Sequence, residues 1–329
     1  KQDIRRVKAT PKVAPKKAKA ATKKSSKWYP GKYASKLIKS VRKGSKRRKI
    51  ESTRAKGITT RGPKQGKGYK LTDGTGAWSA ANDMNNGREG GGTGFGTQTA
   101  GVATGGTPGP AKLVEEYDGT TWTEVTALPT AGGQGGTFGS QTAGVAVGIF
   151  SSTKSMSYNG STWTELATYN TSRTAGMGAG TLTAGLYIGG SPGTPNVEEY
   201  NGSVWTAVGT LNDGRRQAST GGGVTAAMVC GGAAGSPSTN PTQTETYNGS
   251  TWTEVAELNT GRGYLTGGGE SNDAITFGGG PMPGVTTKTE KWNGTAWTEV
   301  GDMANASETA FGTCPGAGSL TYRGGTPGS

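Results

Sequence analysis

Apolar residues beyond about residue 70 fall in short runs, and each run is bounded by Gly, Thr, Asn or Asp. Tryptophan marks the period of this pattern, because successive Trp residues lie 44, 41, 42, 47 and 45 positions apart. They are Trp78, Trp122, Trp163, Trp205, Trp252 and Trp297. Self-similarity at such a period is typical of a β-propeller or a solenoid.

A β-hairpin is predicted around five of these Trp residues. An aromatic residue stands five positions before the Trp, and Asp-Gly or Asn-Gly follows it. The aromatic residues are Tyr117, Tyr158, Tyr200, Tyr247 and Trp292. Asp-Gly and Asn-Gly favour tight turns with positive φ, so we expect the aromatic strand to fold back into the strand that carries Trp.

A second pattern lies between the hairpins, where a Gly-rich stretch leads into an apolar run that ends in Gly-Gly. The copies are TAGVATGG (99–106), TAGLYIGG (183–190), TAAMVCGG (225–232), DAITFGGG (273–280) and SLTYRGG (319–325). One copy, TAGVAVGI (142–149), has Ile149 in place of the second Gly. These runs predict two more strands per repeat, and therefore a four-stranded blade.

The two ends of the repeat region complement each other. The first hairpin, around residues 69–78, lacks preceding strands, and the last repeat ends near Gly325 without an aromatic hairpin. We therefore expect an all-β propeller of six blades over residues 69–329, in which both chain ends share the closing blade. A longer C-terminus would leave room for a seventh blade.

The repeat resembles a known family. With Gly-Gly, a Tyr-containing strand, Trp and then Arg, residues 69–325 resemble kelch-type propeller repeats. A closer similarity is carried by the sequence motif YNGSTWTEV, followed by LNT.R and G.GT.TA. This motif is similar to the kelch-like repeats of virion structural proteins of tailed, especially marine, bacteriophages. The departures are a shorter Tyr-to-Trp spacing and a period below the ~50 residues of kelch. The Asp-box of sialidases is also similar, but an aromatic residue replaces its Asp.

Charge divides the chain into two parts. Residues 1–70 contain 26 of the 36 Lys and Arg but only two of the 22 acidic residues, so their net charge is +24. The remaining 10 basic and 20 acidic residues give the body a net charge of −10. We therefore separate a basic N-terminal arm, residues 1–68, from the propeller, and we expect the arm to seek an acidic partner.

The arm changes character along its length. Residues 1–27 are mostly Lys, Ala, Thr, Ser and Pro, a composition that cannot bury enough apolar surface to order itself. A short helix is predicted within residues 26–49, stopped by Gly44. Its candidate docking residues are Trp28, Tyr29, Tyr33, Leu37, Ile38 and Val41. A basic cluster for an acidic or polyanionic partner overlaps and follows them: Arg42, Lys43, Lys46, Arg47, Arg48 and Lys49.

Three interpretations of the arm remain open. It can be a solvated tail, or it can bind nucleic acid such as packaged DNA, with Trp28, Tyr29 or Tyr33 stacking on bases. The third is an anchor that folds on acidic capsid, collar or tail subunits and leaves the propeller exposed. The phage resemblance favours the anchor, and it implies a location in the virion.

Residue types argue against an enzyme. The absence of His excludes a Ser-His-Asp triad and the usual His-rich copper or zinc sites. Cys230 and Cys314 have no ligand-like neighbours, so no metal is expected. Eight acidic residues repeat at fixed distances from Trp: Glu115, Glu198, Glu245 and Glu290 seven before it, and Glu124, Glu165, Glu254 and Glu299 two after it. Residues copied from blade to blade are structural, because catalysis needs one asymmetric constellation. We expect no chemistry and no cofactor.

Arginine repeats in the same way. Arg88, Arg173, Arg215 and Arg262 each stand ten residues after a Trp, whereas Gly132 and Ser307 occupy that position in the other repeats. One interpretation is a structural Arg that bridges blades or pairs with a repeat Glu. The other is a ring that binds an anionic ligand.

The functional expectation is a virion structural protein whose propeller decorates the particle or contacts the host surface. A carbohydrate-binding propeller is an alternative, with a host surface glycan as partner. No apolar run approaches the roughly 20 residues of a membrane span, so no membrane insertion is expected. Asn-Gly-Ser/Thr matches a glycosylation acceptor, but turn chemistry explains it, and we expect these Asn residues to be unmodified.

Overall fold

The fold is built entirely of β-strands in the part of the chain that can be described. The computed structural model describes residues 68–72, 77–88, 92–106, 112–149, 152–234, 241–280, 284–308, 311–313, 321–323 and 326–327. All of them belong to one compact unit, Thr60–Ser329. The helix expected within residues 26–49 lies outside the described residues, as do the arm's docking residues and basic cluster.

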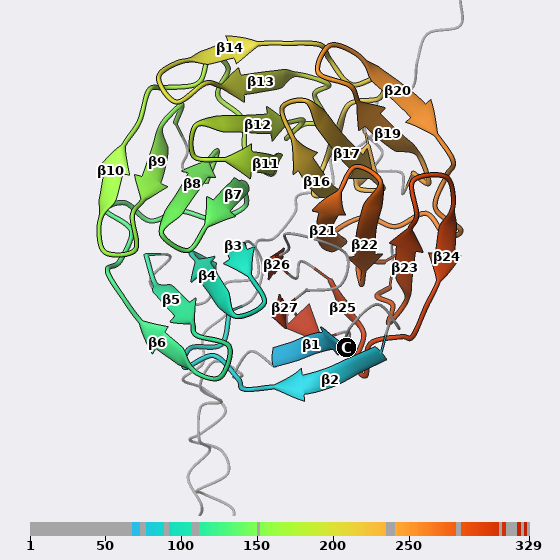
Figure 1. The fold of residues 1–329 in the computed structure, drawn as a ribbon, viewed down its shortest axis with the longest axis horizontal. Helices are drawn as coiled ribbons and strands as arrows, with labels where there is room; N and C mark the ends of the chain where they lie inside the picture. Colours follow the sequence, from blue (N-terminus) through green and yellow to red (C-terminus); the bar gives the residue numbers. More distant parts are fainter. Residues whose placement is uncertain are drawn as a thin grey trace, which may run out of the picture. The chain divides into compact units, whose positions relative to one another are not determined.

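Five four-stranded antiparallel sheets form the blades of a propeller (Figure 1). The innermost strands are β3 (Thr93–Thr97), β7 (Gly136–Ser140), β11 (Met177–Thr181), β16 (Ser219–Gly223) and β21 (Thr266–Glu270). Next come β4 (Ala100–Thr104), β8 (Ala143–Val147), β12 (Ala184–Ile188), β17 (Ala226–Cys230) and β22 (Asp273–Phe277). Third are β5 (Val114–Tyr117), β9 (Ser155–Tyr158), β13 (Val197–Tyr200), β19 (Thr244–Tyr247) and β23 (Thr289–Trp292). Outermost are β6 (Trp122–Glu124), β10 (Trp163–Glu165), β14 (Trp205–Ala207), β20 (Trp252–Val255) and β24 (Trp297–Glu299). We name each blade by its inner strand.

Strands from both ends of the described chain form one further sheet, with the order β2-β1-β27-β26. Its strands are β1 (Gly68–Thr72), β2 (Ala77–Ala81), β26 (Phe311–Thr313) and β27 (Thr321–Arg323). The expected count of six blades is therefore corrected to five, each formed by one continuous segment. The reason is that this remaining sheet is not formed by one continuous segment: β1 and β2 come from the N-terminal side of the described residues, and β26 and β27 from the C-terminal side (Figure 1).

Neighbouring sheets contact one another through their inner strands. β3, β7, β11, β16 and β21 pack in that order, and β26 contacts both β21 and β3. Trp78 of β2 also reaches the β21 blade, where its Nε1 donates to Thr289 Oγ1 at 3.1 Å. Two short pairs of strands supplement the blades: β15 (Arg215–Arg216) with β18 (Ala233–Ala234), and β25 (Ser307–Glu308) with β28 (Thr326–Pro327).

The hairpin expected from the aromatic residue and Trp is present in every blade. Tyr247 and Trp252 lie directly opposite each other on β19 and β20, with ring centroids 5.0 Å apart. The intervening turn is closed by Asn248, whose Oδ1 accepts hydrogen bonds of 2.9 Å from the backbone N–H groups of Ser250 and Thr251. This is an Asx turn, so the repeated Asn is explained by backbone chemistry.

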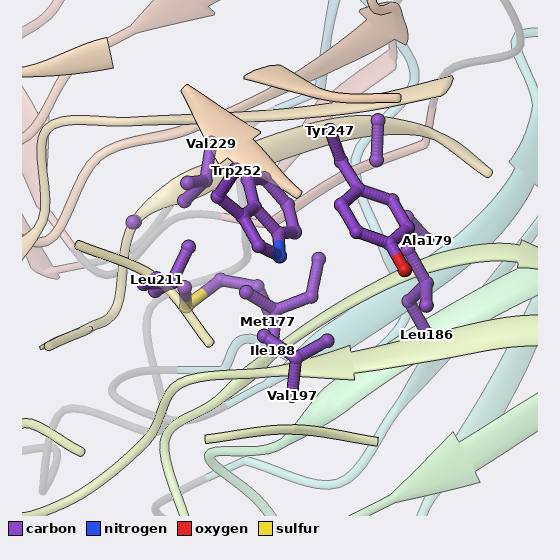
Figure 2. Packing of buried hydrophobic residues seen from close by; sticks show 11 residues of the cluster. Met177, Ala179, Leu186, Ile188, Val197, Leu211, Val229, Tyr247 and Trp252 are labelled. Carbon is purple, nitrogen blue, oxygen red and sulfur yellow. The ribbon is translucent and has the colours of Figure 1, made fainter. Parts of the chain in front are cut away.

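The hydrophobic core lies between blades. One cluster combines Met177, Leu186 and Ile188 of the β11 blade with Tyr247 and Trp252 of the β16 blade (Figure 2). Because the strands alternate between two faces, each blade contributes one apolar set to each of its two neighbours. Trp therefore fills the space between blades, as expected. Within the described residues, no helix has the length and apolar character needed to cross a membrane.

Candidate functional site

The repeat Arg residues hold the linkers that join one blade to the next. Each linker runs from the outer strand of one sheet to the inner strand of the next blade. In the linker before the β16 blade, Arg215 Nη2 lies 2.7 Å from Glu245 Oε1 on β19. Arg215 Nη1 also donates to the carbonyl oxygen of Gln243 at 2.9 Å. Both charged side chains are at most 1% exposed.

The same carboxylate also binds an Asn of the linker. Glu245 Oε2 accepts hydrogen bonds from the backbone N–H of Asn212 at 2.7 Å and from its Nδ2 at 2.9 Å. Asn212 Nδ2 donates in addition to the carbonyl oxygen of Trp252 at 3.3 Å. We call the Asn and Arg of a linker, together with the Glu of the following blade, a clamp. Its charge-assisted bonds fix the linker on the blade that it enters.

Four blades contain a clamp. The other Arg–Glu pairs are Arg88–Glu115 at 2.9 Å, Arg173–Glu198 at 2.5 Å and Arg262–Glu290 at 2.7 Å. Burial lowers the pKa of Arg88, and the hydrogen bond and charge of Glu115 oppose that shift. The repeat Arg side chains are thus engaged by carboxylates of the protein itself, which is the structural role considered for them.

The β7 blade lacks the whole clamp. Its linker has Pro129 and Gly132 at the positions of the Asn and Arg, and Met156 replaces the Glu. Met156 and Ile149 are buried in one apolar cluster that this blade shares with the β3 blade. In the β3 blade, by contrast, a Cβ on Gly106 would lie 3.3 Å from Arg88 Cβ. Ile149 therefore replaces the second Gly in the one described blade whose linker has no Arg.

The remaining repeat residues are structural or exposed. Trp122, Trp205, Trp252 and Trp297 are buried, whereas Trp78 and Trp163 are half-buried. The Glu residues two positions after Trp lie exposed on outer strands, in contrast to the buried Glu of the clamp. Glu165, for example, forms an exposed pair with Lys154 at 2.7 Å. Such pairs contribute little to stability.

A ring of residues with positive φ lies just beyond the clamps. Gln134, Ala175, Gln217 and Tyr264 have φ values of 54°, 58°, 50° and 57°, and each stands 12 residues after a Trp. Two of their peptides connect neighbouring blades, because the N–H of Ala175 donates to Gln134 O and that of Gln217 donates to Ala175 O at 2.9 Å. The left-handed conformation costs an L-residue about 1–2 kcal/mol relative to its preferred regions, and Gly would avoid most of this cost.

These residues line a cavity of ≈ 150 Å³. Its wall also contains the first two residues of each of the five inner strands, so it lies at the end of the propeller axis where these strands begin. Figure 1 shows the five inner strands around that axis. Gln134 is exposed, and Gln217 and Tyr264 are half-buried. The lining residues that the structure describes include no Lys, Arg, Asp or Glu. The described wall of the cavity therefore offers hydrogen-bonding groups to a ligand but carries no net charge.

The described residues contain few groups that could react with a substrate or hold a metal ion. Among them, no group of three or more His, Cys, Asp or Glu residues could hold a metal ion. Cys230 is buried, and burial raises the pKa of its thiol to about 12. A thiol with this pKa is not a nucleophile near neutral pH.

The axial cavity is the feature that the sequence interpretation missed. The residue types Gln, Ala and Tyr do not indicate a positive φ, because they prefer other backbone regions. The sequence did contain one indication of this site: a position that recurs at a fixed distance from Trp but is occupied by a different residue type in different blades. At 12 residues after Trp the sequence has Gln134, Ala175, Gln217 and Tyr264, whereas the position two residues earlier is Arg before the last three of them and Gly132 before the first.

Comparison with models of known protein families gives no match, and no curated protein matches the chain.

Proposed function

We propose that this chain is a structural protein of a tailed-phage particle, in which the propeller is displayed and the basic arm docks on acidic subunits. The observation that carries the proposal is the charge division, +24 in residues 1–70 against −10 in the remainder. The repeat Arg side chains in the described blades are neutralised internally. The arm is therefore the main basic feature left for a partner.

The propeller is suited to display on a particle surface, because its buried repeat Arg and Glu residues stabilise the fold by pairing with each other. Four buried clamps fix linkers on the blades that they enter, and what varies between blades lies at the axial cavity and in the loops. The kelch-like sequence motif of the repeats supports the proposal that the chain belongs to a phage particle. In this proposal the sheet β2-β1-β27-β26 acts as a sixth blade, which is supported by the packing of β26 against β21 and β3 and by the bond from Trp78 to Thr289.

The arm's charge also favours a second candidate, binding of packaged DNA. Lys and Arg gain affinity for any polyanion by releasing counterions, and the arm's aromatic residues can stack on bases. The two candidates differ in what they require of the arm. An anchor needs the apolar residues Trp28, Leu37 and Ile38, whereas DNA binding depends mainly on Lys and Arg.

The test uses particles of the phage that encodes the chain, separated into DNA-filled and DNA-free forms on a density gradient. Mass spectrometry then measures the amount of the chain per particle. The anchor predicts equal amounts in both forms, and protease should cut the propeller from intact particles. DNA binding predicts loss of the chain from DNA-free particles. Absence from both forms would contradict a virion role altogether.

Two arm variants sharpen this test when they are supplied in trans during assembly. The apolar variant combines Trp28→Ala, Leu37→Ala and Ile38→Ala, and the charge variant combines Lys46→Gln, Arg47→Gln and Arg48→Gln. The anchor predicts that the apolar variant is lost from particles, since its docking face is removed. If only the charge variant is lost, a polyanion holds the arm instead.

A further inference from the structure

We infer that the axial cavity binds the terminal residue of a neutral saccharide. This inference rests on the proposed function and gives the displayed propeller a ligand on the host surface. It rests on the side chains around the cavity of ≈ 150 Å³ and on the backbone that presents them. A cavity of about this volume holds a single benzene ring. A hexopyranose is larger than benzene, so the cavity has room for one side of a single terminal sugar and not for a longer chain.

The wall of the cavity selects against charged ligands. Its described residues have Gln, Thr, Ser and Tyr as their polar side chains, and they include no Lys, Arg, Asp or Glu. A phosphate or carboxylate would lose water there without gaining a cationic partner. The four Arg residues that could have supplied one are instead occupied in the clamps.

The polar groups also match what a sugar hydroxyl needs. The amides of Gln134 and Gln217 both donate and accept hydrogen bonds. In the described part of the chain, neither amide nor the Tyr264 hydroxyl has a hydrogen-bond partner within the protein. Thr137 and Thr220 already donate to backbone carbonyls at 2.8 Å, and each keeps its oxygen as an acceptor. The ring of Tyr264 adds an apolar surface against which a sugar ring can stack.

The strained backbone distinguishes what the fold requires at these positions from what the side chains contribute. The inter-blade peptide bonds of Ala175 and Gln217 explain why the backbone is left-handed at this position. They do not explain Gln or Tyr there, because Gly adopts the same conformation without steric cost. Retained strain at residues that line a cavity points to a function of the side chains.

The same strain gives an experiment in which misfolding cannot imitate loss of binding. In the full-length protein, the double variant Gln217→Gly, Tyr264→Gly removes both side chains while keeping, or relaxing, the backbone. Ala175→Gly is the matched control, since it relaxes the same position without removing a polar group. Both variants should melt at or above the wild-type temperature, measured by calorimetry.

Binding is measured first on an array of neutral and acidic glycans. It is then measured by titration calorimetry with free glucose, galactose, mannose and N-acetylglucosamine. We expect wild type and Ala175→Gly to bind at least one neutral sugar at millimolar concentration, and the double variant to bind at least 10-fold more weakly. The inference is overturned if no neutral sugar binds, if acidic glycans alone bind, or if the double variant binds as wild type. This readout uses the isolated chain, so it can fail while incorporation into particles succeeds, and the reverse.

Discussion

Arg215 and Glu245 form a buried ion pair between a linker and the blade that it enters, with 2.7 Å separating Nη2 from Oε1. They are 30 residues apart, and the pairing depends on the linker crossing from one sheet to the next. Because solvent does not reach either side chain, each charge is tolerated only in the presence of the other.

Arg215→Met should therefore destabilise the protein strongly. The substitution keeps most of the side-chain volume but leaves the Glu245 carboxylate buried without its cation. We expect the free energy of unfolding to fall by about 3–5 kcal/mol, as measured by urea denaturation. The double variant Arg215→Met, Glu245→Met should recover much of this loss, because no unpaired charge remains.

The exposed pair of Lys154 and Glu165 is the control for that experiment. Its side chains are 52% and 51% exposed, although its separation is also 2.7 Å. Lys154→Met should change the free energy of unfolding by no more than about 1 kcal/mol, because water screens the pair. Similar losses for Arg215→Met and Lys154→Met would show that burial does not set the strength of the clamp.

Two adjacent glycines in β16 should respond differently to alanine. At Gly222 φ is +83°, and a Cβ would lie 2.1 Å from the carbonyl oxygen of Ala226. At Gly223 the nearest atom to a Cβ would be Gly180 Cα at 3.6 Å, an ordinary contact. We expect Gly222→Ala to cost about 2–4 kcal/mol of unfolding free energy, from backbone strain and overpacking.

Gly223→Ala should stay within about 1 kcal/mol of wild type, since Ala loses less chain entropy on folding than Gly. Melting temperatures of the two variants provide the measurement. Equal destabilisation by both would indicate that the strand tolerates no side chain on this stretch at all, contrary to the geometry at Gly223.

The turn of the β3 blade should make stability sensitive to acid. Asp118 occupies the position of the repeated Asn, and its Oδ1 accepts hydrogen bonds from the N–H groups of Thr121 at 2.6 Å and Thr120 at 2.7 Å. These bonds favour the ionised carboxylate and lower the pKa of Asp118. The resulting stabilisation is present above the unfolded pKa of about 4 and is lost as the pH falls through the lower, folded value.

Asp118→Asn provides the comparison, because Asn closes the same turn in the other blades and does not titrate. The unfolding free energy of wild type relative to this variant should decrease between about pH 5 and pH 2. An NMR titration of the Asp118 carboxyl should give a pKa below about 3.9. A pKa at or above that value would contradict the turn geometry.

The hairpins could be predicted from the sequence because their signals are local. An aromatic residue, Asn-Gly and Trp lie within six positions, and Tyr247 does lie opposite Trp252. The pairing of the chain ends was also accessible, since each end lacks what the other supplies, and β1 does pair with β27. The predicted total of six blades exceeds the five in the structure, because the strands from the two incomplete ends were counted together as a closing blade.

The sequence indicated that a repeat Arg could pair with a repeat Glu, but it did not show which Glu, and it gave no indication of the ring at the cavity. A linker and the third strand of the next blade meet only after the sheets have packed, so no local propensity shows the contact. The left-handed backbone at Gln217 likewise results from bonds between blades. For the clamp a sequence signal did exist, because Arg and Glu are present in four described blades and both are absent from the fifth.

That joint absence leads to the last prediction, in which the β7 blade is given a clamp. Pro129 has no N–H, so the linker loses the donor that Asn presents in the other blades, at the same place where Met156 removes the acceptor. Ile149 then occupies space beside the missing Arg. The four residues therefore form a coherent apolar alternative to the clamp.

Met156→Glu alone should cost about 3 kcal/mol or more of unfolding free energy, because it buries a carboxylate without a partner. Adding Pro129→Asn, Gly132→Arg and Ile149→Gly restores the donors, the cation and the space for its side chain. Most of the loss should then be recovered, which a thermodynamic cycle of urea denaturation measurements can quantify. If Met156→Glu costs as much beside the other three substitutions as it does alone, the four positions act independently. Recovery would show that a clamp can be transferred as a unit to the β7 blade. It would also show that the apolar residues now in this blade compensate for the stability that the missing clamp would provide.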